Sequence, residues 1–258
     1  MLKNKKGLVF GIANDHSIAW GIAKKLSENG AELAITYQND TFLKRVKPLA
    51  EKINSKILIE CDFSKKESIK KCFQEIKKKM QNIDFIIHAV AYSDKNELSG
   101  KYFNTSKDNF INTLNISCFS FTEISKYASE IMNSGGSLLT LSFYGSNKVI
   151  PNYNVMGIAK AALETSVKYL SVDLGSQNIR VNAISAGPMR TLAGAAIANA
   201  REVYNYTQVN SALKRNVELE EIGNTALYLV SDLSNAVSGE IHYVDCGFNI
   251  IGIPKSDN

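Results

Sequence analysis

The sequence predicts an α/β fold in which one doubly wound parallel sheet carries helices on both faces. Short, apolar, β-branched runs alternate with longer helical stretches along all 258 residues. The short runs are apolar at both odd and even positions, which is typical of strands buried on both faces of a parallel sheet. No linker rich in proline, glycine or serine divides the chain, so we expect a single Rossmann-like domain over residues 1–258.

The strands and helices can be assigned in order from these runs. The expected strands are residues 8–10, 32–36, 56–59, 84–88, 137–141, 179–184 and 241–244. The expected helices are residues 18–28, 40–53, 65–80, 107–132, 154–174 and 220–231. Between the last two strands, the stretch before residue 220 is expected to be irregular. Ligands bind at the carboxyl ends of the strands in such folds, so the residues that follow each strand are the candidate site.

The charge and hydropathy of the chain argue against two classes of partner. The net charge is +5, but many lysines lie within the helical stretch 65–79, which indicates a solvated helix face. We expect no nucleic-acid binding, because no recognition motif accompanies this charge. We also expect no membrane insertion, because no run of about 18 apolar residues occurs. The basic N-terminus lacks the apolar core of a signal peptide.

The cysteines and histidines are scattered along the chain. Cys61, Cys72, Cys118 and Cys246 show no C-x-x-C spacing, which indicates reduced thiols and a cytoplasmic location. We expect no metal site, because no pair of ligand residues has the spacing that zinc sites require.

The turn after the first strand has the chemistry of a phosphate-binding loop. Gly11 can turn sharply beside a phosphate, and Ser17 is a favoured residue type at the start of a helix. The free N–H groups near Ile18 would attract a pyrophosphate. The loop is not a G-x-G-x-x-G motif, so by itself it is equally compatible with a plain strand-to-helix turn.

The next strand ends bear on the choice of nucleotide. Gln38 follows the second strand, where dinucleotide folds face the adenosine ribose, and the first basic residue after it is Lys44. A 2′-phosphate would call for Arg or Lys here, so NADH is favoured over NADPH. Asp62 follows the third strand and can accept a hydrogen bond from an adenine amino group, or cap the helix at 65–80. Small residues around Val90 would allow close approach to a cofactor ribose.

Tyr153 and Lys160 are the candidate catalytic pair. They lie seven residues apart, within about 20° of the same face of the expected helix. A tyrosine hydroxyl can donate to a developing oxyanion, and a nearby ammonium is expected to lower its pKa. Lysine can also hold the ribose hydroxyls of a cofactor. A surface lysine and a core tyrosine that happen to align are the alternative interpretation.

This pair resembles the catalytic pair of the short-chain dehydrogenases/reductases. Their usual Tyr-x-x-x-Lys spacing would place the tyrosine at Met156 and a serine at Phe143, which disfavours an ordinary carbonyl reductase. The longer gap instead resembles the NADH-dependent enoyl-[acyl-carrier-protein] reductases of bacterial fatty acid synthesis. The matching motifs are residues 17–19, 36–40, 151–157, 180–188, 190–193 and 238–240.

The resemblance implies reduction of the trans-2 double bond of an enoyl thioester by NADH, a reaction of the oxidoreductases that act on CH–CH bonds. Tyr153 would donate a hydrogen bond to the enolate oxygen, and Lys160 would grip the ribose. The implied cofactor-binding residues are Gly11, Ser17, Ile18, Gln38, Asp62, Phe63, Val90, Lys160, Met189, Arg190, Thr191, Leu192 and Ala193. The implied substrate-binding residues are Ser93, Phe143, Tyr153, Met156 and Ile197.

The resemblance also implies mobile parts and partners. Residues 192–209 would form a flap over the acyl chain, and their alanines favour helix. The partner would be an acyl carrier protein, which is acidic and compatible with the positive net charge. A homotetramer is implied, and the apolar residues 248–253 are either an interface element or ordinary core.

Two positions depart from the family pattern. Most relatives have a tyrosine where Phe143 stands, and the neighbouring Tyr144 should point to the opposite face of its strand. Ala200 stands where relatives often have a bulky aromatic residue. Two other functions stay open at this point: another short-chain dehydrogenase/reductase acting on a carbonyl or an enone, and a non-catalytic NADH-binding protein.

Overall fold

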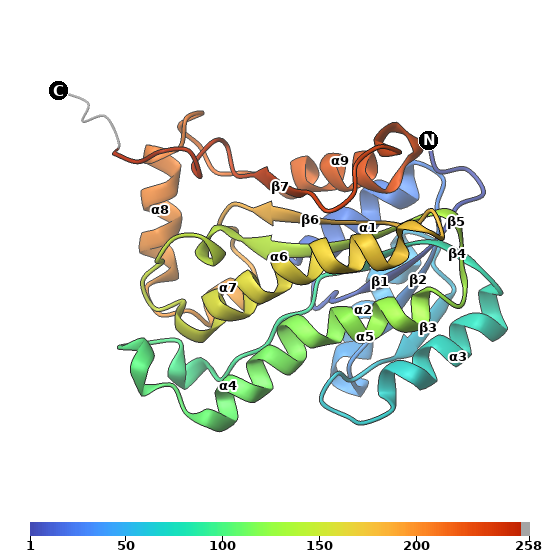
Figure 1. Cartoon of the computed structure of the whole chain (residues 1–258), viewed down its shortest axis with the longest axis horizontal. Helices are drawn as coiled ribbons and strands as arrows, with labels where there is room; N and C mark the ends of the chain where they lie inside the picture. Colours follow the sequence, from blue (N-terminus) through green and yellow to red (C-terminus); the bar gives the residue numbers. More distant parts are fainter. Residues whose placement is uncertain (254–258) are drawn as a thin grey trace.

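The computed structural model describes residues 1–253 and builds them around one seven-stranded parallel sheet (Figure 1). The strands are β1 (Lys6–Phe10), β2 (Glu32–Tyr37), β3 (Ile57–Glu60), β4 (Ile83–His88), β5 (Met132–Phe143), β6 (Arg180–Ala186) and β7 (Ile241–Val244). Their order is β3-β2-β1-β4-β5-β6-β7, and every neighbouring pair is parallel. The direction of winding therefore reverses between β1 and β4, which is where such folds bind their ligands.

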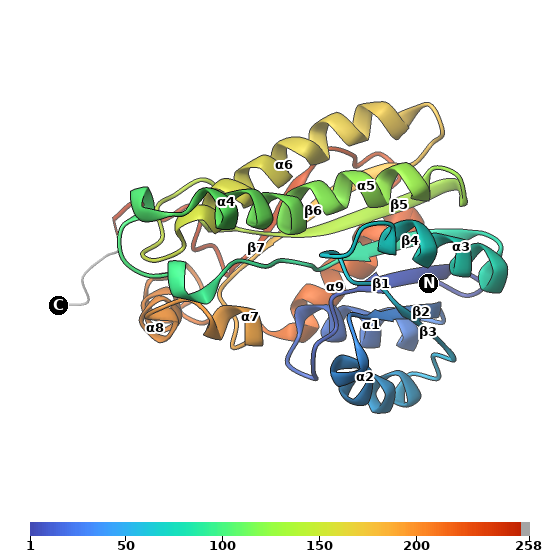
Figure 2. The ribbon, with the colours of Figure 1, turned by 90° about the horizontal axis from the view of Figure 1, so that it is seen from below.

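Helices cover both faces of this sheet, which confirms the doubly wound α/β class. The α-helices are α1 (Ile18–Glu28), α2 (Asp40–Lys52), α3 (Ser68–Met80), α4 (Lys107–Leu114), α5 (Ser120–Ala128), α6 (Asn154–Gly175), α7 (Leu192–Ala195), α8 (Ala200–Asn210) and α9 (Leu219–Val230). Short 3-10 turns are η1 (Lys95–Glu97), η2 (Tyr102–Asn104), η4 (Tyr144–Ser146) and η5 (Asp232–Ser234). Figure 2 shows α4, α5 and α6 above the sheet, with α1, α2 and α9 below it.

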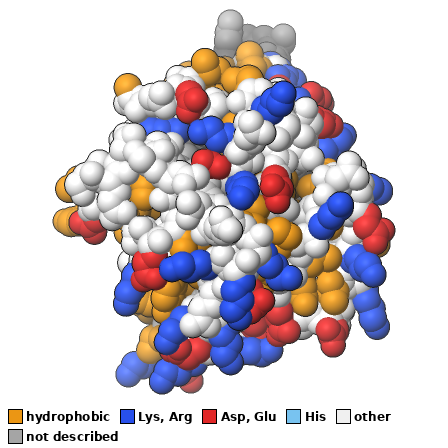
Figure 3. Space-filling model, turned by 90° about the vertical axis from the view of Figure 1, so that its right-hand side faces the viewer, with side chains coloured by type: hydrophobic (Ala, Val, Ile, Leu, Met, Phe, Trp, Pro, Cys, Tyr) orange, Lys and Arg blue, Asp and Glu red, His pale blue; other side chains and the backbone are white. Residues whose placement is uncertain are grey.

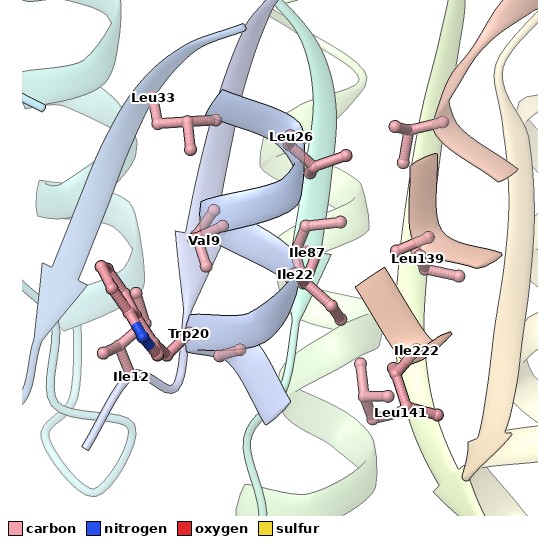
Figure 4. Packing of buried hydrophobic residues seen from close by; sticks show 14 of the residues in the cluster. Val9, Ile12, Trp20, Ile22, Leu26, Leu33, Ile87, Leu139, Leu141 and Ile222 are labelled. Carbon is pink, nitrogen blue, oxygen red and sulfur yellow. The ribbon is translucent and has the colours of Figure 1, made fainter. Parts of the chain in front are cut away.

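Two apolar clusters fill the space between the sheet and its helical layers. In the first cluster, Ile22 and Leu26 of α1 lie over Val9 and Ile87 of the sheet (Figure 4). The second cluster packs α3, α5 and α6 against the opposite face, with Phe121 at its centre. The strands are therefore buried on both faces, as their apolar runs predict.

The surface at the amino-terminal end of the strands carries both signs of charge. Figure 3 shows this end, where Lys and Arg side chains are interspersed with Asp and Glu. The lysines of α3 pair with acidic neighbours, as Lys70 does with Glu67 at 3.2 Å and Lys78 with Glu75 at 2.8 Å. This is the solvated helix face that the lysine spacing predicts. Across residues 1–253 there is no helix with both the length and the apolar character needed to cross a bilayer.

Three elements differ from the sequence prediction. The stretch 107–132 is not one helix: a π-helical turn, η3 (Asn115–Phe119), interrupts it, and β5 begins at Met132. The apolar residues Ile131 and Met132 continue the helical pattern in sequence, but the carbonyl of Ile131 accepts from the N–H of Ile83, at the start of β4. Residues 192–209 are not irregular, because α7 and most of α8 lie within them. The alanine content of this segment does favour helix.

Candidate active site

A cavity of about 1080 Å³ opens where the carboxyl ends of the strands meet. All of the residues predicted to bind the cofactor line it: Gly11, Ser17, Ile18, Gln38, Asp62, Phe63, Val90, Lys160, Met189, Arg190, Thr191, Leu192 and Ala193. Phe143, Tyr153, Met156 and Ile197 line it as well. The cavity is therefore continuous from the predicted adenosine end to the predicted substrate end. Its volume suits a dinucleotide together with part of a second ligand.

Ser93 is the one predicted site residue that the structure leaves outside this lining. Its hydroxyl donates a hydrogen bond to Asn109 Oδ1 at 3.3 Å and accepts one from Thr113 Oγ1 at 3.0 Å. Ser93 therefore anchors the loop after β4 to α4. The cavity wall at this point is formed by Tyr92 and Leu98, which sequence reasoning missed. Leu98 comes from the loop before η2, and no local pattern in the sequence marks it.

The turn between β1 and α1 is built to bring backbone N–H groups to the cavity. Gly11 has φ +99, and a Cβ at this position would lie 2.0 Å from the backbone oxygen of Ala89. Ser17 stands at the N-cap of α1, but its hydroxyl accepts from the N–H groups of Ala13 and Asn14, each at 3.0 Å. It thus shapes the loop and leaves the amino end of α1, beginning at Ile18, to face an anion.

The adenosine end of the cavity carries a fixed carboxylate. Asp62 accepts from Ser64 N–H at 3.0 Å, Ser64 Oγ at 2.7 Å and Gln38 Nε2 at 3.3 Å. Burial acts to raise the pKa of Asp62, but these hydrogen bonds and Lys65 hold it below its usual value. An ionised Asp62 fits an adenine amino group. Asp62 does not have the alternative role of helix cap, because α3 begins at Ser68 with Glu67 as its N-cap.

The side chains at the carboxyl end of β2, where the adenosine ribose is expected, are neutral. Thr36, Tyr37, Gln38 and Phe42 line the cavity there, while Lys44 lies further along α2, outside the lining. A ribose with free hydroxyl groups fits these side chains better than a 2′-phosphate, which would need a cation beside it. The residues present therefore fit NADH.

Tyr153 and Lys160 are brought to the same stretch of the cavity wall, as their spacing predicts. Both side chains are buried, with 6% of each residue exposed. The Tyr153 ring packs edge-on against Phe143, with ring centroids 5.0 Å apart. Lys160 Nζ donates to the backbone oxygen of Leu141 at 2.7 Å, which fixes the ammonium at the end of β5.

The protonation of this pair differs from the prediction. Lys160 was expected to lower the pKa of Tyr153, but burial raises that pKa, and the charge of Glu164 raises it further. Desolvation is the largest cause, because the phenolate would lie in an enclosed apolar setting. Burial also lowers the pKa of Lys160 to about 8, against the opposing effects of Cys118 and Glu164. At neutral pH, Tyr153 is a hydrogen-bond donor beside a charged lysine.

The substrate end is an apolar pocket around Tyr153. Leu98, Met156 and Ala159 are buried with it, and Phe143, Ile150 and Ile197 pack against them. Tyr144 does not replace the hydroxyl that Phe143 lacks, because it packs on Phe248 at 5.5 Å and lies outside the lining.

The segment 192–209 closes one side of the cavity. The N–H of Ala198 donates to Leu98 O at 3.1 Å, and Asn152 Nδ2 donates to Ala198 O at 3.0 Å. Arg190 lies over the ring of Tyr204, with its Cζ 4.6 Å from the centroid. Ala200 faces the cavity at the start of α8 and fills little of it. The segment therefore lies against the apolar pocket, where Ala196 and Ile197 pack on its cluster.

A doubly wound sheet with a dinucleotide cavity, and a Tyr–Lys pair at the N-cap and within the first turns of α6, defines an oxidoreductase of the short-chain dehydrogenase/reductase type. A family model described as enoyl-(acyl carrier protein) reductase matches residues 11–249. The chain belongs to this enoyl-(acyl carrier protein) reductase family.

Individual relatives agree with this assignment. Enoyl-[acyl-carrier-protein] reductase [NADH] 2 of Rhizobium meliloti is 57% identical over 254 residues, which cover 98% of this chain and 95% of that protein. The crystal structure of FabI from Candidatus Liberibacter asiaticus has a TM-score of 0.96 at 56% identity and covers 98% of each chain. The reductase of Anaplasma phagocytophilum, crystallised with NAD, has a TM-score of 0.95 at 51% identity, covering 99% of this chain and 97% of its own.

Proposed function

We propose that this chain is an NADH-dependent enoyl-[acyl-carrier-protein] reductase of fatty acid elongation. It reduces the trans-2 double bond of an enoyl thioester to the saturated acyl thioester. The observation that carries this function is the position of Tyr153, a protonated and buried donor between a dinucleotide cavity and an apolar pocket. Carbonyl reduction has less support, because Phe143 and Met156 occupy the positions where that chemistry would need a serine and a tyrosine.

The residues around the reacting carbons have different roles in the reaction. Bound NADH would supply the hydride for the β-carbon of the enoyl group, and a proton from solvent would complete the reduction at the α-carbon. Tyr153 donates a hydrogen bond to the thioester oxygen as negative charge develops there, an interaction that is stronger in the transition state than in the substrate. Lys160 holds the nicotinamide ribose hydroxyls with the donors that Leu141 O leaves free. Phe143 supports the Tyr153 ring through its edge contact.

The acyl chain binds in the apolar pocket beneath residues 192–209. Ile197 and Ala196 of this segment already pack against the cluster that contains Tyr153 and Met156. Closure of the flap over the acyl chain removes water from the thioester, which strengthens the hydrogen bond from Tyr153. Because Ala200 is small, the pocket keeps room beside α8 that a bulky aromatic residue would fill.

The physiological substrate is carried on an acyl carrier protein, and the chain acts as a homotetramer in the cytoplasm. The positive net charge favours association with an acidic carrier. Exposed apolar side chains on α6 support self-association. Four free thiols, three of them buried, suit a reducing compartment.

The decisive test is NADH oxidation at 340 nm with trans-2-dodecenoyl thioester, comparing the wild type with Tyr153→Phe. The variant keeps the ring but loses the donor, so we expect kcat to fall by about 10²-fold or more. NADH binding, followed by fluorescence, should be retained because the phenyl ring and Lys160 remain. NADPH and a β-ketoacyl thioester serve as controls and should be poor substrates. A wild type that binds NADH but does not turn over enoyl thioesters would overturn the proposal.

A further inference from the structure

Behind the catalytic pair lies a buried carboxylate that the mechanism above does not use. Glu164 follows Lys160 by one turn of α6 and is 9% exposed. Its Oε1 accepts from Ser142 Oγ at 2.5 Å and from Ser146 Oγ at 2.6 Å. Its Oε2 accepts from Asn147 Nδ2 at 3.3 Å. A buried carboxylate with three donors is costly to desolvate, so its position calls for a specific role.

The donors to Glu164 come from the corner that supports the tyrosine. Ser142 and Ser146 flank Phe143, whose ring contacts Tyr153, and Gly145, where a Cβ would lie 2.4 Å from the Tyr153 ring. The carboxylate thus holds both ends of this corner against α6. Asn147 also donates to the hydroxyl of Tyr243 at 2.8 Å, which ties the corner to β7.

Glu164, one turn after Lys160 on α6, is the carboxylate placed to act as a counter-charge to the Lys160 ammonium. The nearest partner of this ammonium is the neutral carbonyl of Leu141, and within residues 1–253 no carboxylate lies within 4.0 Å of its Nζ. Cys118 of η3, His88 of β4 and Glu164 interact electrostatically with Lys160, and Tyr153 lines the same cavity. His88 is neutral, since burial and Lys160 lower its pKa to about 3. Burial raises the pKa of both Cys118 and Tyr153, so these groups are neutral as well.

We propose that Glu164 is a positioning residue of the active site, which clamps the corner between β5 and α6 against Tyr153 and supplies the buried negative charge that keeps Lys160 protonated. The two roles are separable, because the hydrogen bonds need only an acceptor whereas the effect on Lys160 needs the charge. The inference rests on the proposed function for its kinetic consequence. It makes a second claim, on the titration of Lys160, that is independent of turnover.

Glu164→Gln separates the two roles. The glutamine oxygen can still accept from Ser142 and Ser146, and the Asn147 amide can turn to meet the new NH₂ group. In the wild type, kcat/KM for NADH should fall as pH rises through about 8, where Lys160 loses its proton. In Glu164→Gln this fall should move to lower pH, because the charge that favours the ammonium is gone. Circular dichroism and thermal unfolding establish that the variant is folded.

Two control variants are needed: one keeps the carboxylate of Glu164, and the other removes a different carboxylate. Ser146→Ala removes one donor but leaves the carboxylate, so it should lower kcat without moving the alkaline limb. Asp173→Asn removes a carboxylate from an exposed position on the same helix and should match the wild type in both respects. An alkaline limb that overlays the wild type in Glu164→Gln would overturn the counter-charge role.

The titration of Lys160 can also be measured directly. The ¹³Cε resonance of Lys160, assigned with a Lys160→Arg variant, should titrate at lower pH in Glu164→Gln than in the wild type. An unchanged titration would refute the inference even if the enzyme turned over normally. If the wild type fails to reduce enoyl thioesters, the proposed function fails, while this titration still decides the role of Glu164.

Discussion

Burial decides the protonation state of the ionisable side chains around the catalytic pair. The pKa of Tyr153 rises and that of Lys160 falls, and in both cases desolvation is the largest cause. The sequence shows that these two residues share a helix face, but it does not show how deeply they are buried. The expected lowering of the tyrosine pKa was wrong for this reason. Burial depends on Phe143, Leu98 and the segment 192–209, which are distant in sequence.

His88 should make the stability of the folded protein depend on pH. It is fully buried at the end of β4, with its ring nitrogens 2.9 Å from Thr140 Oγ1 and from Ser120 Oγ. Burial, and then Lys160, lower its pKa to about 3 from the usual 6.5 of a histidine. The unfolded chain therefore binds a proton that the folded protein does not, at any pH between these values. Stability from this group is complete above pH 6.5 and is lost as the pH falls toward 3.

The test of this prediction is urea unfolding at several pH values, followed by the fluorescence of Trp20, the single tryptophan. Between pH 7 and pH 5 the wild type should lose about 2 kcal/mol through His88. His88→Gln keeps an amide for Thr140 and Ser120, and its stability should depend less steeply on pH. His16→Gln alters a histidine whose side chain is 68% exposed and should keep the wild-type slope. Equal slopes in wild type and His88→Gln would contradict the assignment.

The turn between β1 and α1 leaves no room for a side chain at Gly11. Gly11→Ala places a methyl group 2.0 Å from the Ala89 oxygen and forces a side chain into φ +99. The turn must then move away from β4, and with it the amino end of α1 that faces the pyrophosphate. We expect NADH affinity, measured by fluorescence titration, to fall about tenfold or more, since a tenfold loss is only ~1.4 kcal/mol.

A matched glycine tests whether this effect belongs to the turn. Gly175 ends α6, and a Cβ added there meets no heavy atom within 4 Å among residues 1–253. Gly175→Ala should therefore leave NADH affinity unchanged and should not destabilise the fold. An unchanged affinity in Gly11→Ala would show that the loop does not approach the cofactor closely.

Elements with local signals are the ones the sequence predicts best. The bounds of α1 (Ile18–Glu28) and β7 (Ile241–Val244) agree with the prediction, because each apolar run has clear limits. The interruption at Asn115–Phe119 has no such signal. There Ser117 Oγ accepts from the N–H of Tyr92 and donates to its carbonyl, at 2.9 and 3.0 Å, so the π-turn meets the loop after β4. Long-range contacts of this kind change the shape of a helix but do not change the spacing of its apolar residues, so the sequence does not reveal them.

The same limit applies to the candidate site. Residues that directly follow a strand, such as Gly11, Gln38 and Asp62, could be found because the fold class predicts where strand ends meet. Ser93 follows the same rule yet lies outside the cavity, because its hydroxyl is taken by Asn109 and Thr113. Glu164 follows no strand and was not predicted. Its partners Ser142, Ser146 and Asn147 belong to the corner between β5 and α6, and only the folded chain brings them to it.

At the scale of the whole molecule, α6 carries an apolar stripe on its outer side. Ile158, Tyr169 and Val172 are 41%, 72% and 79% exposed, and they lie within about 60° of one another around the helix. In the same helical layer (Figure 2), Ile111 of α4 and Phe119 of η3 are each 55% exposed. Apolar side chains grouped on adjacent helices are typical of a protein–protein interface, and they support the proposed tetramer.

Val172→Glu tests this interface by placing a charge where a second chain would bury it. An unpaired charge at a buried interface costs several kcal/mol, so we expect light scattering after size exclusion to detect smaller species than the tetramer proposed for the wild type. Gln74→Glu adds the same charge at an exposed position on α3 and should leave the assembly unchanged. Since α6 also carries Lys160 and Glu164, the dissociated variant should lose activity together with its assembly. A wild-type mass for Val172→Glu would show that the stripe faces solvent.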